Sequence, residues 1–109
     1  MNVNFAGYRE HVLTFERDKS VAVGDLVKMA SSGKVTKVSD GDLFIGKCLA
    51  IRGDFAAIQV DGYIEETKFG KIDVGYNNLV AESVGVKTDS AGICKLVIYS
   101  DESTIGFIL

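Results

Sequence analysis

The residue types that most often carry catalysis or bind metals are few in this chain, and they lie far apart. Among 109 residues there are one histidine, His11, and two cysteines, Cys48 and Cys94. Zinc sites built from these residues use three or four clustered ligands, and neither cysteine has a Cys-x-x-Cys neighbour or a nearby histidine. His11 precedes an apolar stretch with no nucleophile placed beside it. We therefore expect no catalytic residues, no metal ligands and no cofactor.

Cys48 and Cys94 both lie in apolar stretches, where a cysteine packs as a small hydrophobic residue. Residues 1–11 contain neither the basic segment nor the long apolar segment of a secretory signal. Since disulfides are typical of exported proteins, we expect both thiols to be free.

Acidic residues suggest calcium binding or acid–base catalysis, and neither pattern is complete. Asp40 and Asp42 flank a glycine, but calcium needs six to eight oxygens and the twelve-residue loop pattern is missing. A solvated turn is the expected structure there. The carboxylates at 65–66 and 101–102 are direct neighbours, and neighbours on a strand point to opposite faces. They would not converge on one substrate.

Lys28 and the overall charge argue against three classes of binding protein. The sequence Val-Gly-Asp-Leu-Val-Lys-Met at 23–29 can be compared with biotinyl and lipoyl carriers, but a modified lysine must project from a hairpin tip, and Lys28 lies in a predicted strand. With 12 basic and 15 acidic residues, the net charge of −3 disfavours nucleic acid as a partner, including in the manner of small basic RNA-binding barrels. No apolar run approaches the roughly 18 residues of a membrane span.

The elements that must position these residues have the periodicity of strands. Short stretches rich in Val, Ile, Thr, Tyr and Phe alternate with Gly, Asp, Asn and Ser turns, and there is no proline. We expect an all-β fold, a small single-domain barrel or sandwich of about eight to ten short strands, with residues 1–10 as an N-terminal arm and 11–109 as the β domain. The predicted strands are 11–16, 26–30, 35–38, 45–51, 55–60, 63–68, 78–82, 86–88, 93–100 and 104–109.

Two further patterns concern how these strands are connected. Asp61-Gly62 between two strands predicts a two-residue type I′ hairpin. There is also an internal likeness, which indicates two similar halves unless it is a coincidence of short apolar patterns. It pairs Val23-Gly24 with Val74-Gly75, Leu26-Val27 with Leu79-Val80, the strand after Gly33 with the one after Gly85, and Ile45-Gly46 with Ile105-Gly106.

One resemblance extends over most of the chain. It is carried by Tyr-Arg-Glu at 8–10, Val-Gly-Asp-Leu-Val at 23–27, Gly-Lys-Val at 33–35, Phe-Ile-Gly at 44–46, Arg-Gly-Asp-Phe-Ala-Ala-Ile-Gln-Val-Asp-Gly-Tyr at 52–63, Val-Gly-Tyr-Asn-Asn-Leu-Val-Ala at 74–81 and Gly-Phe-Ile-Leu at 106–109. In order and spacing these pieces resemble the capsid decoration, or head cement, proteins of tailed bacteriophages and prophages.

The resemblance implies a non-enzymatic virion protein that binds and stabilises the outer surface of a capsid, commonly as a trimer. Its partner would be the major capsid protein, and it would be present in the bacterial cytoplasm during assembly. The N-terminal arm is a candidate capsid contact, unless it is merely a frayed end. The candidate contact residues are Asn2, Val3, Asn4, Phe5 and Tyr8.

Two alternatives to the structural function stay open. The first is a small-molecule or carbohydrate-binding β module with its ligand in the mouth of a barrel. The aromatic residues that could line it are Tyr63, Phe69, Tyr76 and Tyr99, although packing in the core or in hairpins would also account for them. The second is an enzyme, for which the sequence offers no catalytic constellation.

Overall fold

The structure is a computed structural model, and it describes residues 11–109. Within that range the chain forms ten strands and no helix. The strands are β1 (Val12–Glu16), β2 (Leu26–Met29), β3 (Val35–Lys37), β4 (Gly46–Arg52), β5 (Phe55–Gln59), β6 (Tyr63–Lys68), β7 (Gly75–Glu82), β8 (Gly85–Thr88), β9 (Ile93–Ser100) and β10 (Thr104–Ile108). The all-β prediction is confirmed, and each predicted strand corresponds to an observed one.

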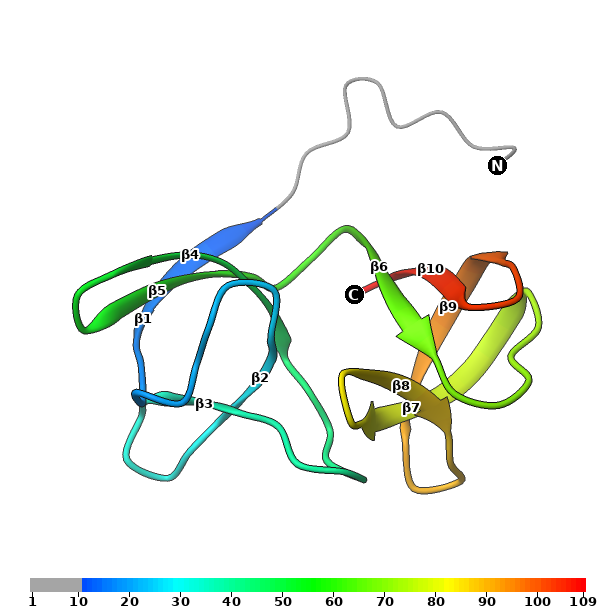
Figure 1. Cartoon of the computed structure of the whole chain (residues 1–109), viewed down its shortest axis with the longest axis horizontal. Helices are drawn as coiled ribbons and strands as arrows, with labels where there is room; N and C mark the ends of the chain where they lie inside the picture. Colours follow the sequence, from blue (N-terminus) through cyan, green and yellow to red (C-terminus); the bar gives the residue numbers. More distant parts are fainter. Residues whose placement is uncertain (1–10) are drawn as a thin grey trace.

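The strands form two five-stranded units that lie side by side (Figure 1). In the first unit, β1 to β5, the sheet order is β1-β5-β4-β2-β3. In the second unit, β6 to β10, the strands form a closed barrel in the order β10-β6-β8-β7-β9. Adding five to each strand number of the first unit gives β6-β10-β9-β7-β8, which is the order around the barrel of the second. The two units therefore share one topology.

The closure of the two units is also equivalent. In the second, β6 and β8 pair in parallel at Thr67–Gly85 and Lys68–Val86. In the first, the corresponding strands meet only at a single parallel bridge between Arg17 and Val35. The bridge lies at the equivalent place, because Arg17 precedes Lys68 by as many residues as Val35 precedes Val86. The first unit is thus an incompletely closed copy of the second.

The buried residues correspond one to one. The core of the first unit consists of Val21, Val27, Val35, Cys48, Ala56 and Ile58. Strand registers and the loops before β2 and β7 match these residues, in order, to Ile72, Leu79, Val86, Val97, Ile105 and Phe107, all in the core of the second unit. Each unit also has a register shift at the same place, at Leu49 in β4 and at Ile98 in β9. The prediction of two similar halves is confirmed. The predicted match of Leu26-Val27 to Leu79-Val80 is one residue out of register, since Val27 corresponds to Leu79.

The two units are joined by a shared core. Leu26 and Phe44 of the first unit belong to the same buried cluster as Ile64 and Phe107 of the second. The Phe44 and Phe107 rings lie 5.9 Å apart between centroids, in a tilted arrangement that is favourable for aromatic pairs. The loop before Phe44 pairs with the end of β7, because the Gly41 amide donates to the Ala81 carbonyl and the Ala81 amide donates to the Asp42 carbonyl.

Two details of the predicted connections are wrong. Asp61-Gly62 does not close a hairpin, because β5 pairs with β1 and β4 whereas β6 pairs with β10 and β8. Gly62 has a positive φ of 100°, but Asp61 does not, and a type I′ turn needs both. These residues instead carry the chain from one unit to the other. The likeness of Ile45-Gly46 to Ile105-Gly106 is not structural either, since Gly46 lies in β4 and Gly106 in β10.

Candidate interaction surface

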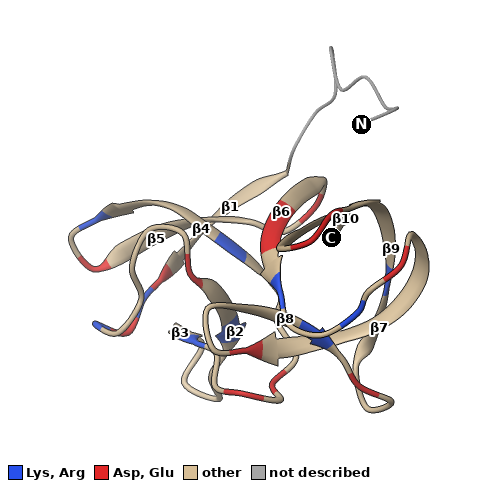
Figure 2. Ribbon diagram, turned by 45° about the vertical axis from the view of Figure 1, so that its right-hand side comes forward, with Lys and Arg blue, Asp and Glu red and all other residues tan. Residues whose placement is uncertain are grey.

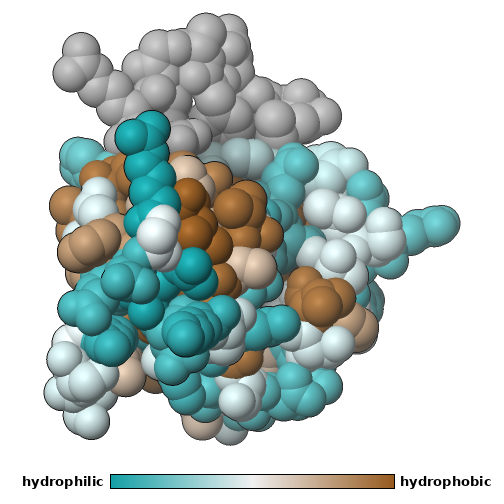
Figure 3. Space-filling view, turned by 60° about the vertical axis from the view of Figure 1, so that its left-hand side comes forward, coloured by the Kyte–Doolittle hydropathy of each residue, from teal (hydrophilic) through white to brown (hydrophobic). Residues whose placement is uncertain are grey.

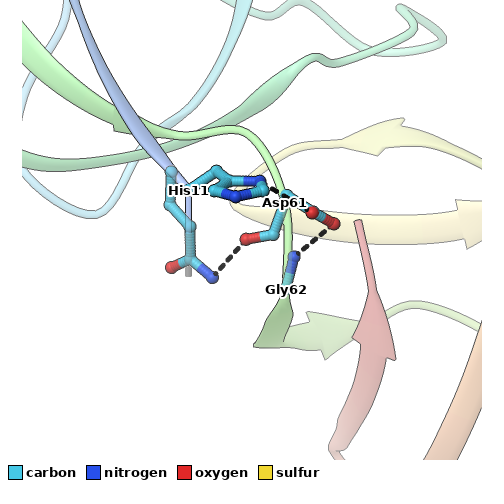
Figure 4. Close-up of polar contacts among 4 residues, drawn as sticks. His11, Asp61 and Gly62 are labelled. Atoms are coloured by element: carbon cyan, nitrogen blue, oxygen red, sulfur yellow. Dashed lines mark hydrogen bonds and ion pairs between the residues drawn. The ribbon is translucent and has the colours of Figure 1, made fainter. Parts of the chain in front are cut away.

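His11 lies where the chain crosses between the units, and its contacts there are structural. Its Nδ1 is 3.0 Å from Oδ2 of Asp61, whose other carboxylate oxygen accepts the Gly62 amide at 2.8 Å (Figure 4). The buried Gln59 amide donates to the carbonyls of Asp61 and Tyr63, each at 3.1 Å. Together these bonds fix the path of the crossing, with His11 exposed beside it.

The two cysteines differ in environment. Both thiols are free. Cys48 is buried in the core of the first unit, as expected, and this burial raises the pKa of its thiol. Cys94 lies in β9 but is exposed, so the prediction that it packs as a small hydrophobic residue is wrong. The stretch around Cys94 is apolar, but Cys94 is the second residue of β9 and its neighbour Ile93 is exposed as well.

The acidic turn at 40–42 binds the chain's own donors. Asp40 accepts the Ser83 amide at 2.5 Å, and Asp42 accepts the Ser39 amide at 2.8 Å and the Lys28 ammonium at 2.6 Å. The lysine holds the pKa of Asp42 below its usual value. Within residues 11–109 no group of His, Cys, Asp or Glu side chains is placed to hold a metal ion.

A buried carboxylate lies at the seam between the two units. Glu65 is exposed and Glu66 is buried, as expected for neighbours on a strand. Glu66 forms an ion pair with Lys47 of β4, and the same ammonium donates to the Glu65 carbonyl at 3.1 Å. Burial raises the pKa of Glu66, and the attraction of Lys47 opposes that rise. Sequence reasoning missed this pair because its partners are 19 residues apart and belong to different units.

The four aromatic residues considered for ligand binding do not share one site. Tyr63 and Tyr99 lie on strands to either side of Gly106 in β10, and their hydroxyls donate to Glu65 at 2.7 Å and to Asp101 at 2.6 Å. Burial, together with the hydrogen bond to Glu65, raises the pKa of Tyr63, and the hydrogen bond to Asp101 raises the pKa of Tyr99. The other two rings lie elsewhere, Phe69 beside Gly85 and Tyr76 exposed on β7.

An apolar depression of about 440 Å³ lies on the outer face of the first unit. Its floor is a row of small side chains that oppose one another across three strands, Thr14 in β1, Ala57 in β5 and Ala50 in β4. Exposed Phe55 and the stem of Arg52 form its wall. Figure 3 shows apolar side chains gathered on the side of the molecule formed by this unit.

The second unit explains why this depression is open. Strand register matches Ala50 to Tyr99 and Ala57 to Gly106. In the second unit the ring of Tyr63 lies directly over Gly106, so an added Cβ would overlap it. The equivalent of Tyr63 in the first unit is Val12, which is too short to cover Ala57 in this way. The same fold therefore carries a covered outer face in one unit and an uncovered one in the other.

Charged residues lie at one end of the depression. At its end, Glu16, Phe55 and Arg52 oppose one another on adjacent strands, so the rim carries one charge of each sign. Figure 2 shows that acidic and basic residues are interspersed along the strands and loops of both units. An apolar centre with a polar rim is the usual anatomy of a protein–protein interface.

The candidate arm residues Asn2, Val3, Asn4, Phe5 and Tyr8 lie outside the described residues. Residues 11–109 contain no helix that is long and apolar enough to cross a membrane. Comparison of the chain with protein-family models, curated proteins and solved structures gives no match.

Proposed function

We propose that this chain is a non-enzymatic structural protein that binds the outer surface of a tailed-phage capsid and stabilises the shell as a homo-oligomer, by analogy a trimer. Two findings support the proposal. The first is the ordered resemblance to capsid decoration proteins along most of the sequence. The second, which carries it, is the open apolar depression over Thr14, Ala50 and Ala57 on the first unit.

A site of this kind suits attachment to a large assembly. One apolar side chain of a capsid subunit seated among three small residues would bury a modest area. The affinity of one such contact is low, but an oligomer presents several copies at once, and simultaneous engagement multiplies the retention time. The major capsid protein is the proposed partner, and the virion surface the proposed location.

The test is a co-sedimentation assay with shells assembled from the major capsid protein encoded in the same genome. The wild-type chain should sediment with the shells. Ala57→Glu places a carboxylate on the floor of the depression, where a docked partner would remove it from water without a counter-ion. We expect its affinity to fall at least about tenfold, which corresponds to about 1.4 kcal/mol.

The matched control is Val74→Glu, which adds the same charge at an exposed apolar position in the second unit, outside the depression. Circular dichroism confirms that both variants remain folded. The proposal fails if the wild-type chain does not bind shells, and the docking surface is wrong if Ala57→Glu binds as well as Val74→Glu does.

A further inference from the structure

We infer that the free edge of β1 in one copy binds the outer face of β7, β9 and β10 in a second copy. The inference specifies the self-association that the proposed function includes, and it does not depend on a capsid. It rests on the duplication within the chain. Inside the molecule, the edge of β6 in the second unit contacts a face of the first unit formed by β2, β4 and β5. The equivalent edge in the first unit is that of β1, and the equivalent face in the second unit is formed by β7, β9 and β10. Both of these are uncovered.

The contact made inside the molecule is between the edge of β6 and the first unit. The carbonyls of Tyr63 and Glu65 on that edge accept hydrogen bonds from the side chains of Gln59 and Lys47, each at 3.1 Å. Between them, Ile64 is only 4% exposed and belongs to the buried cluster that contains Leu26 and Phe44 of the first unit. The edge of β6 is therefore covered by the other unit.

The equivalent edge is that of β1. Val12 faces Gln59 in β5 as Tyr63 faces Ile108 in β10, so Val12 and Leu13 correspond to Tyr63 and Ile64. Leu13 is 52% exposed where Ile64 is 4% exposed. Val12 is 44% exposed as well. The same strand position is thus covered in the second unit and uncovered in the first.

The backbone of β1 is also available on this side. The His11 carbonyl accepts the Val60 amide and the Arg17 amide donates to the Asp54 carbonyl, just beyond the two ends of β5. In the alternating antiparallel pattern, Val12 and Thr14 therefore direct their amides and carbonyls away from β5. Within residues 11–109, β1 meets another strand on that side only at the Arg17–Val35 bridge. An apolar edge with free backbone groups is prone to pair with another chain.

The covering surface is present twice too. Inside the molecule it consists of Leu26, Lys47 and Gln59, which oppose one another in register on β2, β4 and β5. In the second unit, Leu96 and Ile108 correspond to Lys47 and Gln59. Tyr76 of β7 pairs with Leu96 as Leu26 pairs with Lys47, so Tyr76, Leu96 and Ile108 form the same kind of row across β7, β9 and β10. Tyr76 is 77% exposed, and Leu96 and Ile108 are half-buried.

These two uncovered surfaces match in chemistry. The row Tyr76, Leu96 and Ile108 carries no charge, and neither do Val12 and Leu13 on the β1 edge. Since the two surfaces of the contact are different, it is head-to-tail: each copy offers its β1 edge to one neighbour and its β7-β9-β10 face to another. Repetition of such a contact closes a ring when the rotation allows it.

The experiment uses one variant for each side of the contact. Leu13→Asp places a charge on the β1 edge, and Tyr76→Asp places one on the opposite face; both positions are exposed, so neither charge is buried in the fold. Val84→Asp, at an exposed apolar position in the turn after β7, is the matched control. Molar mass is measured by light scattering on the eluting protein, with circular dichroism as the check on folding.

We expect the wild-type chain and Val84→Asp to form the same oligomer, and Leu13→Asp and Tyr76→Asp each to be monomeric. An equal mixture of the two monomeric variants retains one intact pair of surfaces and should form a dimer. Val12→Asp repeats the edge test, should Leu13→Asp fail to fold.

The inference is overturned if the wild-type chain is monomeric, if only one of the two variants dissociates, or if their mixture stays monomeric. Pairing of β1 with β1 of another copy would leave Tyr76→Asp oligomeric. Shell binding reads out the proposed function separately: a chain that self-associates in this way but ignores shells refutes only that function. A chain that binds shells while Leu13→Asp keeps its oligomer refutes only the inference.

Discussion

Glu66 is the residue at which the cost of burial and the gain from an ion pair compete most directly. Its side chain is 6% exposed, whereas that of its partner Lys47 is 25% exposed. Taking a carboxylate out of water costs several kcal/mol, and only a close counter-ion offsets that cost. The position of Glu66 at the seam means that this competition bears on how the two units are held together.

The raised pKa of Glu66 predicts a pH dependence with a definite sign. In the unfolded chain the carboxyl titrates near its ordinary value of 4.5, and in the folded protein it titrates higher. The folded state therefore binds more protons in that interval, so the contribution of Glu66 to stability falls as the pH rises through it. Glu66→Gln removes this contribution. We expect the free energy of unfolding of Glu66→Gln, minus that of wild type, to increase from about pH 4 to about pH 7.

Urea unfolding at several pH values measures this difference. Glu65→Gln is the control, because the exposed side chain of Glu65 accepts from Tyr63, and only its backbone carbonyl, which the substitution keeps, contacts Lys47. Its difference from wild type should change much less with pH. A flat difference for Glu66→Gln would show that burial does not perturb this carboxyl in the folded protein.

Gly106 and Tyr63 form a second coupled pair. A Cβ at Gly106 would overlap the Tyr63 ring, whereas the equivalent position in the first unit is an alanine, Ala57. We expect Gly106→Ala to destabilise the protein by about 1–3 kcal/mol, as overpacking does. In a Tyr63→Val background, which imitates Val12, the same substitution should cost at least about 1 kcal/mol less. Thermal unfolding of the four proteins of this cycle gives the coupling, and additive effects would refute it.

At the scale of the elements, β1 differs from an inner strand because only every second backbone amide is bonded. The Leu13 amide pairs with Ile58 in β5, and the Thr14 amide points away from β5. Proline removes the amide hydrogen and is tolerated on an edge strand where that hydrogen faces outward. We expect Thr14→Pro to cost less than about 1 kcal/mol relative to Thr14→Ala, and Leu13→Pro to cost at least about 2 kcal/mol relative to Leu13→Ala. Equal costs in thermal unfolding would mean that β1 is not an edge.

The strands were predictable from sequence because each alternates and ends at a turn residue. Their partners were not, because pairing depends on burial between distant segments. Asp61-Gly62 has the composition of a hairpin turn, yet Gln59 and Glu66 on either side of it are buried against the other unit. The internal likeness identified the right pair of strands at Leu26-Val27 but was one residue out of register there, since Val27 corresponds to Leu79 and not to Val80. It failed at Ile45-Gly46, where two letters coincide on strands that do not correspond.

The interaction surfaces were less predictable than the strands. The sequence indicates that Glu65 and Glu66 face opposite sides, but not that Lys47 meets one of them. The depression over Ala57 is defined by what is missing there, namely a ring like that of Tyr63. This contrast becomes visible only when the registers of both units are compared.

At the scale of the whole molecule, we expect the shared core to make the two units unfold together. Phe44 extends from the first unit onto Phe107 in the second, and both are buried. Two probes can follow the units separately. Cys48 is buried in the first unit, and three of the four tyrosines, Tyr63, Tyr76 and Tyr99, lie in the second. In the wild-type chain the urea midpoints from Cys48 reactivity and from tyrosine fluorescence should coincide.

Phe44→Ala should lower the stability by about 3 kcal/mol and separate these two midpoints, because it removes the ring that couples the cores. The measurements use a Tyr8→Phe, Cys94→Ser background, so that every signal originates within the described units. Ile58→Ala, inside the core of the first unit, is the control that lowers stability without removing the coupling ring. If midpoints remain coincident in Phe44→Ala, contacts other than this ring hold the units together.

The chain passes from one unit to the other only once between residues 11 and 109, at Asp61-Gly62, whereas non-covalent contacts join the units at several places. The covalent link between the units and the contacts that hold them together are therefore formed by different parts of the molecule. Cutting the backbone at this crossing would leave two fragments with complementary surfaces already shaped for each other. Expressed as separate polypeptides, they would form a split protein whose reassembly reports that their fusion partners have come together.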